Sequence, residues 1–255
     1  MGKIIAIANQ KGGVGKTTTA INLSSCLAAK GKKVLVIDTD PQGNTTSGLG
    51  VEKNDLENTI YELILGECSI RDCIITGVID HLDLVPSNVN LAAAEIELIG
   101  VERKEFILKN AVDYVIDQYD YVIIDCPPSL NMLTINSMTT ANSVLVPIQC
   151  EYYALEGLSQ LIHTINLVKA RLNPNLDMEG VVFTMYDART NLSMQVVENV
   201  KSNLNQYIFK TLIPRNIRLA GAPSYGMPIC RYDSKSAGAE AYMNLAEELI
   251  KKNES

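Results

Sequence analysis

The sequence lacks any long hydrophobic run. Its unbroken apolar stretches are short, as at Tyr121–Ile124 and Val144–Ile148, whereas a helix that spans a membrane needs about 20 consecutive apolar residues. The N-terminus passes from Lys3 directly into an apolar segment and then into glycines, without the pattern of a secretory signal peptide. We therefore expect a soluble, cytoplasmic protein that has no membrane partner.

Cysteine and histidine are also scarce. The 255 residues include six cysteines and two histidines, with no C-x-x-C pair and no closely spaced pair of histidines. This spacing disfavours a zinc or iron–sulfur site within one chain, and the cysteines are too few for a disulfide scaffold. We therefore expect buried free thiols at Cys26, Cys68, Cys73, Cys126, Cys150 and Cys230.

Positive charge is in deficit overall, but the deficit is confined to one part of the chain. The formal net charge is −7, and residues 1–150, with 11 basic and 18 acidic side chains, account for all of it. Residues 151–255 carry 11 of each sign, and residues 187–235 carry seven bases against three acids. The bulk charge argues against a nucleic-acid binder, whereas one basic segment on an acidic body can still form a local patch.

Short apolar runs alternate with stretches of helical periodicity. The runs do not alternate polar and apolar residues, which is typical of strands buried on both faces of a parallel sheet. The alternation predicts a single doubly wound α/β domain over residues 1–255, with a mostly parallel sheet and helices on both faces. The predicted strands are Ile4–Ala8, Val34–Ile37, Tyr121–Ile124, Val144–Ile148 and Val181–Met185, and the predicted helices are Thr17–Lys30, Phe106–Gln118, Leu130–Ala141, Leu155–Arg171, Leu192–Gln206 and Ala237–Lys251.

A glycine-rich loop follows the first predicted strand and reads Asn-Gln-Lys-Gly-Gly-Val-Gly-Lys-Thr-Thr over residues 9–18. Glycines let backbone N–H groups converge on a phosphate, and the N-terminus of the following helix adds the positive end of its dipole. Lys16 suits the β- and γ-phosphates, and the Thr17 hydroxyl suits a Mg²⁺ ion. The usual P-loop pattern G-x4-G-K-[ST] has Gln10 at its first position here, and a second lysine, Lys11, precedes the glycine pair.

Carboxylates follow two other apolar runs. Asp38 and Asp40 follow the second predicted strand, and Asp125 follows the third. Ligands in open α/β sheets bind at the carboxyl ends of the strands, which is where these side chains would lie. We expect Asp125 to hold Mg²⁺ through water and Asp40 to orient or polarise an attacking water.

The loop Lys11–Thr18 resembles the deviant Walker A box of the ParA/MinD superfamily of P-loop NTPases. Further stretches resemble chromosome-partitioning ParA proteins of the Soj type, and the match covers essentially the whole chain. In that family ATP drives formation of a sandwich homodimer, in which the lysine that matches Lys11 reaches the partner's nucleotide. A cation supplied in this way neutralises charge that develops at the γ-phosphate. The matching stretches are Asp38–Gly50, Ile123–Ser129, Gln149–Leu161, Thr184–Asn191 and Ile213–Pro223.

The resemblance implies roles for individual positions at the phosphates. Catalysis would rest on Lys11, Lys16 and Asp40, the last as the aspartate that positions water. Magnesium would be associated with Thr17, Asp40 and Asp125. The phosphate cradle falls on Gly12, Gly13, Val14, Gly15, Lys16, Thr17 and Thr18.

The resemblance also implies a base site and a DNA-binding surface. On the adenine side, Pro214 would pack on the base and Asn216 would offer hydrogen bonds. Arginines that bind double-stranded DNA without sequence preference match Arg189 and Arg218, which lie in the basic segment 187–235.

The activity that the resemblance implies is weak, Mg²⁺-dependent ATP hydrolysis. The ATP-bound homodimer would bind DNA and partition chromosomes or plasmids together with a ParB-type centromere-binding protein, and DNA and this partner would stimulate turnover. The protein would then be cytoplasmic and associated with the nucleoid.

Three other functions are weighed against this one. A MinD-like membrane-cycling ATPase that positions cell division needs a basic amphipathic C-terminal helix, whereas Glu240–Glu254 carries two bases and four acids. We expect the apolar positions of Ala237–Ser255 to pack in the core. A reductase like the nitrogenase iron protein would share a cluster between two chains, but only Cys126 lies near the expected site. A scaffold that binds nucleotide without turnover is disfavoured by Lys11 and Asp40.

Overall fold

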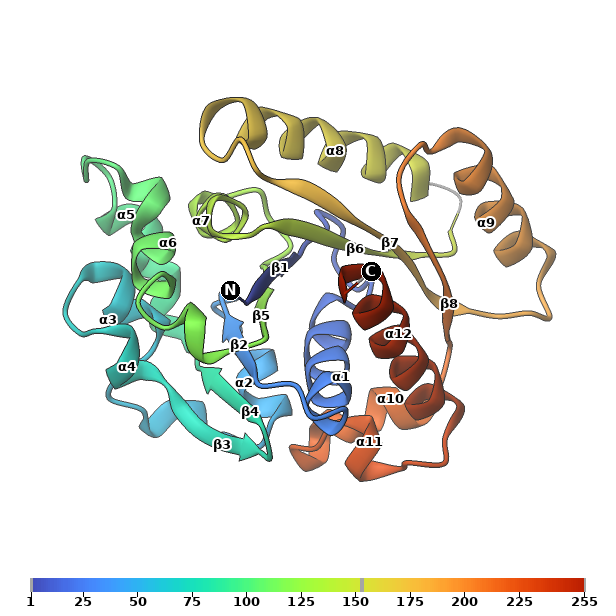
Figure 1. Cartoon of the computed structure of the whole chain (residues 1–255), viewed down its shortest axis with the longest axis horizontal. Coiled ribbons are helices and arrows are strands. Elements are labelled where there is room, and N and C mark those ends of the chain that lie inside the picture. The colour runs from blue at the N-terminus through green and yellow to red at the C-terminus, as the bar shows by residue number, and fades with distance from the viewer. Residues whose placement is uncertain (1, 152–153, 255) are drawn as a thin grey trace.

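An eight-stranded sheet forms the centre of the computed structural model, which describes residues 2–151 and 154–254 (Figure 1). The strand order is β3-β4-β2-β5-β1-β6-β7-β8, and every pairing is parallel except that of β3 with β4. The predicted fold class is therefore confirmed. Residues 152 and 153, which belong to the stretch 149–161 that carries part of the family resemblance, lie outside the described residues. The strands are β1 (Lys3–Ile7), β2 (Val34–Asp38), β3 (Ile75–Ile79), β4 (Leu82–Val85), β5 (Tyr121–Asp125), β6 (Ser143–Gln149), β7 (Asp177–Tyr186) and β8 (Ile208–Pro214).

Helices cover both faces of the sheet. Along β1, Ile4 and Ala6 pack into one apolar core, whereas Ile5 and Ile7 pack into the other. The first core lies under α3 (Ile60–Leu65), α4 (Ile70–Cys73), α5 (Ala94–Glu97), α6 (Ile107–Val112), α7 (Met132–Thr140), α8 (Ala154–Arg171) and α9 (Asn191–Asn203). The second core lies under α1 (Lys16–Ala29), α10 (Ile217–Gly221), α11 (Ile229–Tyr232) and α12 (Ala237–Glu254), and the short α2 (Asn44–Gly48) follows β2.

Three strands, β3, β4 and β8, were not predicted. In β3 and β8 only one or two residues are fully buried, and Thr, Gly or Lys interrupt the apolar residues. Edge strands of this kind lose the unbroken apolar signal that marks β2 and β5, in which every residue is buried. The strand β4 is only four residues long, and an acidic residue, Asp83, interrupts it.

The helix predicted over residues 106–118 is interrupted in the structure. It consists of α6 and a separate 3₁₀ segment, Ile116–Gln118. Between them, Tyr114 N and Val115 N donate to the carbonyls of Ala111 and Val112, so the hydrogen bonds tighten to the i+3 pattern. Several β-branched residues weaken the helix here, and the tighter turn brings the chain to the sheet, where Asp120 N donates to Lys33 O at 2.8 Å.

All six cysteines are free, but two of them are not fully buried as predicted. Cys68 is half-buried because it lies in the turn between α3 and α4, and Cys230 is half-buried because it lines a surface cavity.

The C-terminal helix α12 packs its apolar face against α1 and β8, as predicted. Tyr242, Leu245 and Leu249 are fully buried there. Glu248 accepts hydrogen bonds from Thr211 and Tyr207, which anchors the helix on the edge strand. In the described part of the chain, no helix is both long enough and apolar enough to cross a membrane.

Candidate nucleotide-binding site

The glycine-rich loop connects β1 to the start of α1 at the carboxyl edge of the sheet. Gly13 and Gly15 have φ values of +75° and +88°, a left-handed conformation that other residues adopt only under strain. A Cβ atom on Gly12 or Gly13 would meet nothing within 4 Å, so the loop faces open space. Gly15 caps α1 without a side-chain hydrogen bond, which leaves the first N–H groups of this 14-residue helix pointing at that space. The arrangement suits a phosphate anion.

Two polar side chains fix the loop to the sheet. Asn9 Nδ2 donates to Pro147 O at 2.8 Å, while its Oδ1 accepts the backbone N–H of Lys11 at 3.0 Å. Thr184 Oγ1 donates to Val14 O at 2.7 Å. Sequence reasoning missed both roles, because the contacts join the loop to β6 and β7, which are distant in the chain. The sequence offered one indication of these roles: Asn9 directly follows the first predicted strand, and Thr184 lies within the predicted strand Val181–Met185.

Lys16 lies inside the loop and is nearly buried. Its Nζ donates to the carbonyl of Lys11 at 3.1 Å. Burial lowers the pKa of this ammonium, while the attraction of Asp125 and Asp40 acts in the opposite direction. The charge is therefore held over the loop, where the β- and γ-phosphates of a nucleotide would lie.

Two carboxylates end the neighbouring strands β2 and β5, where Asp38 is paired with Asp125. Oδ2 of Asp125 accepts hydrogen bonds from the hydroxyls of Thr17, at 2.9 Å, and Thr45, at 2.7 Å. Its Oδ1 is buried and has no hydrogen-bond partner among the described residues. Burial, followed by repulsion from Asp38, raises the pKa of the Asp125 carboxyl. An unpaired carboxylate oxygen beside the Thr17 hydroxyl is the donor set that fits Mg²⁺ and its water ligands.

Asp38 organises the loop that carries Asp40. Its carboxylate accepts the backbone N–H of Thr46 at 2.9 Å, the Thr46 hydroxyl at 2.8 Å and the backbone N–H of Asp40 at 3.1 Å. Burial raises the pKa of Asp38 against these hydrogen bonds. Asp40 is 8% exposed, and its Oδ1 accepts Gln42 N at 2.9 Å. Sequence reasoning noted Asp38 as a carboxylate at a strand end, but did not assign it this positioning role.

Lys11 lies on the outer side of the loop and forms an ion pair with Glu151, which follows β6. Their side chains are 46% and 42% exposed. The structure thus separates the two lysines of the motif, since Lys16 points into the loop and Lys11 is held at the surface. Glu151 was not predicted as a partner.

A cavity of about 180 Å³ adjoins the loop on the side of α10 and α12. Pro214 and Asn216, both predicted on the adenine side, line it together with Tyr242. Asn216 Oδ1 caps α10 by accepting the N–H groups of Arg218 and Leu219, so its Nδ2 is the end of the amide that can donate to a base. The Tyr242 hydroxyl lies 3.1 Å from Thr19 Oγ1 and thereby joins α12 to α1.

The segments that carry Arg189 and Arg218 lie beside each other, because they follow the paired parallel strands β7 and β8. Arg215 N donates to Tyr186 O at 3.0 Å at this junction. Arg189 is 87% exposed, and its guanidinium donates to both carboxylate oxygens of Asp187, at 2.9 and 2.7 Å. The hydrogen bonds that Asp187 accepts from the side chain and backbone of Arg189, and to a smaller extent the attraction of its charge, lower the pKa of Asp187 to about 2.

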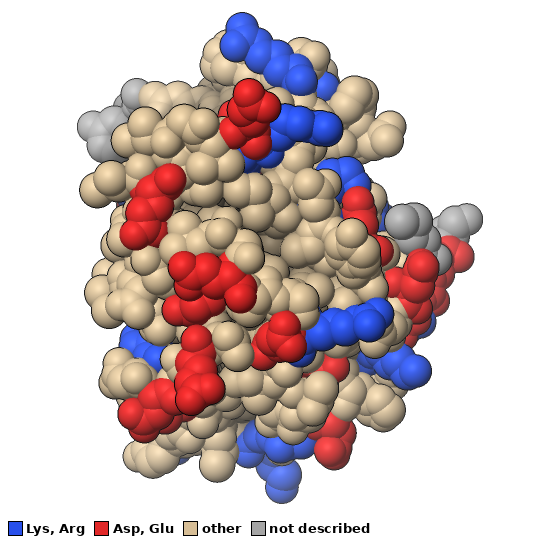
Figure 2. Space-filling model, turned by 90° about the vertical axis from the view of Figure 1, so that its left-hand side faces the viewer, with Lys and Arg blue, Asp and Glu red and all other residues tan. Residues whose placement is uncertain are grey.

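Arg218 is also paired, with its Nε 3.4 Å from Asp233 Oδ2. On the opposite side of the molecule, the face that carries α3 to α6, acidic side chains are spread over the surface (Figure 2). The loops after β7 and β8, which carry the two arginines, lie on the other side of the molecule from this face (Figure 1).

Comparison with known proteins is consistent with this geometry. A family profile described as an AAA domain matches residues 2–178. The chain is 55% identical over 249 residues to the sporulation initiation inhibitor protein Soj of Bacillus subtilis, with 98% of both chains covered. It is 50% identical over 253 residues to the chromosome partitioning protein ParA of Myxococcus xanthus, covering 99% of this chain and 89% of that protein. It also matches a crystal structure of cobyrinic acid a,c-diamide synthase from Mycobacterium smegmatis with a bound ATP analog and magnesium. The TM-score is 0.88 and the sequence identity is 36%, and the match covers 100% of this chain and 97% of that one.

Proposed function

Since this chain belongs to the Soj/ParA family of chromosome-partitioning ATPases, we propose that it binds ATP with Mg²⁺, hydrolyses the ATP, and uses this cycle to partition DNA. The observation that carries the proposal is the unpaired, buried Oδ1 of Asp125 beside Thr17, at the base of a loop that is open to a phosphate. A bound metal ion would satisfy this oxygen, and its positive charge would offset the two buried carboxylates.

The residues around the loop would have different roles in phosphoryl transfer. The N–H groups from Gly12 to Thr18 would hold the phosphates, and Lys16 would neutralise the β- and γ-phosphate charge. Thr17 and Asp125 would hold the metal ion, which stabilises the charge on the phosphate oxygens when it is bound. Asp40 would hold the attacking water. Its carboxylate lies at the same edge of the sheet, and Asp38 fixes the backbone that carries it.

Lys11 would act between two chains. In the single chain its side chain is held by Glu151 at the surface, on the outer side of the loop. In an ATP-bound homodimer it would exchange this ion pair for the partner's γ-phosphate, so that neither site is complete until both chains meet. Assembly and turnover are then coupled, and the isolated chain hydrolyses ATP slowly.

The base would occupy the cavity next to Pro214 and Asn216. The ring of Pro214 offers an apolar surface to one face of the base, and Asn216 Nδ2 can donate to a ring nitrogen. Adenine offers acceptor nitrogens that such a donor can reach.

DNA would bind to the basic loops after β7 and β8. Arg189 and Arg218 are mostly exposed, and each would exchange its carboxylate partner, Asp187 or Asp233, for a phosphate of double-stranded DNA. Contacts with phosphates alone give no sequence preference. A dimer presents two such surfaces, so the ATP state binds more tightly through avidity and stays on the nucleoid until a ParB-type partner stimulates hydrolysis.

Partitioning is proposed over two other activities. The diamide synthase neighbour is 36% identical, whereas the relatives named for sporulation initiation inhibition and chromosome partitioning are 55% and 50% identical over nearly the whole chain. A MinD-like membrane cycle is disfavoured because the apolar face of α12 is already packed against α1 and β8.

One experiment tests the proposal as a whole. DNA binding and size-exclusion profiles are measured with ATP, ADP and no nucleotide, for the wild type and for Asp40→Ala. Only ATP should produce dimers that bind DNA, and Asp40→Ala should accumulate them because it keeps the phosphate loop and loses turnover. DNA binding that is indifferent to nucleotide, or normal hydrolysis by Asp40→Ala, would contradict the proposal.

A further inference from the structure

Two cysteines lie in contact at the turn between α3 and α4, in a part of the molecule that the proposed ATPase cycle does not use. The sulfur atoms of Cys68 and Cys73 are 3.2 Å apart, and both thiols are free. Reacting atoms that are held about 3–3.5 Å apart are already close to the geometry of reaction. The pair therefore needs little movement to form a disulfide bond.

Local hydrogen bonds hold the two sulfurs in place. Cys68 lies in the turn after α3, and the next residue caps α4, where Ser69 N donates to the carboxylate of Asp72 at 2.9 Å. One turn of helix then brings Cys73 back beside Cys68. The Cys73 thiol donates to the carbonyl oxygen of Thr59 at 3.3 Å, which fixes it against the start of α3. The pair is therefore positioned by the backbone of two helices.

Solvent reaches the two thiols unequally. Cys68 is half-buried and lines a cavity of about 440 Å³ between α3, α4 and α6. The apolar side chains of Leu63, Ile70 and Ala111 form part of the same lining. Cys73 is only 1% exposed. A small molecule that enters the cavity therefore meets the Cys68 sulfur first, whereas Cys73 is reached through its contact with Cys68.

We propose that Cys68 and Cys73 form a dithiol that reacts with small, uncharged disulfides through this cavity and closes a disulfide bond within the chain. The Cys68 thiolate attacks one sulfur of the small disulfide, whose S–S bond breaks. One small thiolate leaves with the bonding electrons and takes up the proton that Cys68 lost. The Cys73 sulfur then attacks the Cys68 sulfur, and the second small thiolate leaves with the Cys73 proton. Two protein thiols are oxidised to one disulfide, and one small disulfide is reduced to two thiols.

Charge around the pair favours an uncharged reagent. Burial raises the pKa of both thiols, and the hydrogen bond with Cys73 lessens the rise for Cys68. Since the thiolate is the nucleophile, the reaction should be faster at alkaline pH. The groups around Cys68 carry more negative than positive charge, so they would repel an anion such as oxidised glutathione. These groups are Glu62 of α3, Glu67 of the following turn, Asp72 and Arg71 of α4, and Tyr114 after α6.

The disulfide would leave α3 and the nucleotide site undisturbed. Thr59 O would lose the hydrogen bond from Cys73, but it keeps the one that Leu63 N donates at 3.2 Å. The hydroxyl and backbone N–H of Thr59 still donate to the Glu62 carboxylate, so the cap of the helix remains. The inference thus stands apart from the proposed function, since a chain that failed to hydrolyse ATP would still form the bond.

The test uses the reduced full-length protein and 2-hydroxyethyl disulfide at about pH 8.5. After alkylation, trypsin releases Cys68 in residues 54–71 and Cys73 in residues 72–103, each as the sole cysteine of its peptide. A disulfide-linked pair of these two peptides is expected in the wild type. Cys73→Ser should stop at a mixed disulfide between Cys68 and the reagent, and Cys68→Ser should leave Cys73 unmodified. Oxidised glutathione at the same concentration should form the linked pair more slowly.

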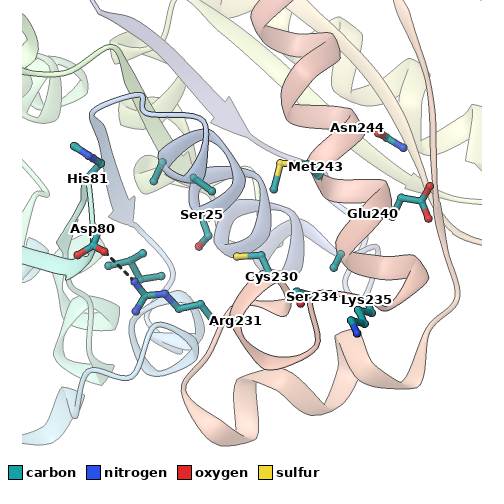
Figure 3. Close-up of a pocket in the computed structure, with 14 residues that line it drawn as sticks. Ser25, Asp80, His81, Cys230, Arg231, Ser234, Lys235, Glu240, Met243 and Asn244 are labelled. Atoms are coloured by element: carbon teal, nitrogen blue, oxygen red, sulfur yellow. Dashed lines mark ion pairs between the residues drawn. The ribbon is translucent and has the colours of Figure 1, made fainter.

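The other half-buried thiol provides the matched control. Cys230 lines a separate cavity of about 770 Å³, which is enclosed by α1, the turn between β3 and β4, α11 and α12 (Figure 3). Cys230→Ser should form the link between Cys68 and Cys73 as fast as the wild type does. The absence of the linked peptides in the wild type, or their presence only in a covalent dimer on a non-reducing gel, would overturn the proposal. So would an equal rate with oxidised glutathione.

Discussion

Glu151 holds Lys11 in an ion pair at the outer edge of the phosphate loop, although the two residues are 140 positions apart in the sequence. Both side chains are more than 40% exposed, so solvent screens the attraction, and an ion pair of this kind contributes at most about 1 kcal/mol. Such a contact can hold the lysine in a single chain and still be exchanged for a phosphate group.

Replacing Glu151 with Gln should make ATP-dependent dimerisation easier. The substitution removes the competing carboxylate from both chains of the dimer, and the loss of at most about 1 kcal/mol per chain corresponds to an increase of up to about 30-fold in the association constant. Sedimentation velocity with MgATP measures this constant directly. The Lys11→Ala/Glu151→Gln double variant should dimerise no better than Lys11→Ala, and a gain that survives without Lys11 would contradict the explanation.

The two lysines of the loop should fail in different ways. Lys16→Ala removes the cation that faces the β- and γ-phosphates and should reduce nucleotide affinity by at least about 100-fold. Lys11→Ala should leave nucleotide binding by the monomer nearly unchanged, but abolish dimerisation and turnover. Titration with a fluorescent ATP analogue, alongside size-exclusion chromatography, separates these effects. Indistinguishable variants would refute the division of roles.

The substitution Asp125→Asn should abolish the rise in melting temperature that Mg²⁺ produces. The pKa of the Asp125 carboxyl is raised by burial, so its charge costs stability at neutral pH, and the neutral amide should leave the melting temperature without Mg²⁺ equal to the wild type or higher. The further increase that Mg²⁺ produces at fixed ATP concentration should be lost. Thermal shift assays with and without Mg²⁺ measure both effects. Asp120→Asn, at the opposite end of β5, is the control that should keep the increase.

The surroundings of Glu179 lead us to expect that the free energy of unfolding depends on pH. Burial acts to raise its pKa, but hydrogen bonds from Lys252 and Ser143 and the nearby Lys3 outweigh it, so the pKa is lowered. A carboxylate of this kind stabilises the fold above its unfolded pKa, about 4.3, and the stabilisation disappears as the pH falls through the lower folded value.

The variant Glu179→Gln should therefore lose about 1–3 kcal/mol of unfolding free energy at pH 7, and the difference from the wild type should shrink below about pH 4. Urea unfolding at both pH values tests this. Glu247→Gln, which removes an exposed ion pair with Lys30, is the matched control and should change little. A difference that is the same at both pH values would contradict the ionic role of Glu179.

Replacing Arg189 and Arg218 together with alanine should weaken DNA binding by the ATP state at least about tenfold and leave dimerisation intact. The slope of log K against log salt should fall by about 0.9 for each phosphate that the variant no longer neutralises. Fluorescence anisotropy over a series of salt concentrations measures both quantities. The double variant Arg71→Ala/Arg171→Ala removes the same charge outside the basic segment and should bind as the wild type does. An equal loss of DNA affinity in the two double variants would contradict the assignment of DNA binding to Arg189 and Arg218.

The parts of the site that follow local rules could be predicted from the sequence. Glycines, Lys16 and a helix start identify the phosphate loop, and the unbroken apolar runs that end at Asp38 and Asp125 identify two buried strands. What escaped prediction depends on contacts between distant segments, such as the hydroxyl of Thr45 on Asp125 or the pairing of Lys11 with Glu151. No periodicity records such contacts, because each arises only when the sheet has assembled.

The position of Tyr242 has a consequence for the order in which the protein acquires its activity. This side chain belongs to the last helix, yet it lines the cavity proposed for the base and lies beside Thr19 on α1, the helix that follows the glycine-rich loop. A ribosome that makes the chain from its N-terminus completes the phosphate loop first and α12 last. If the base binds in this cavity as proposed, a chain that still lacks α12, or a fragment cut short before it, would have a phosphate loop but a base site without one of its walls.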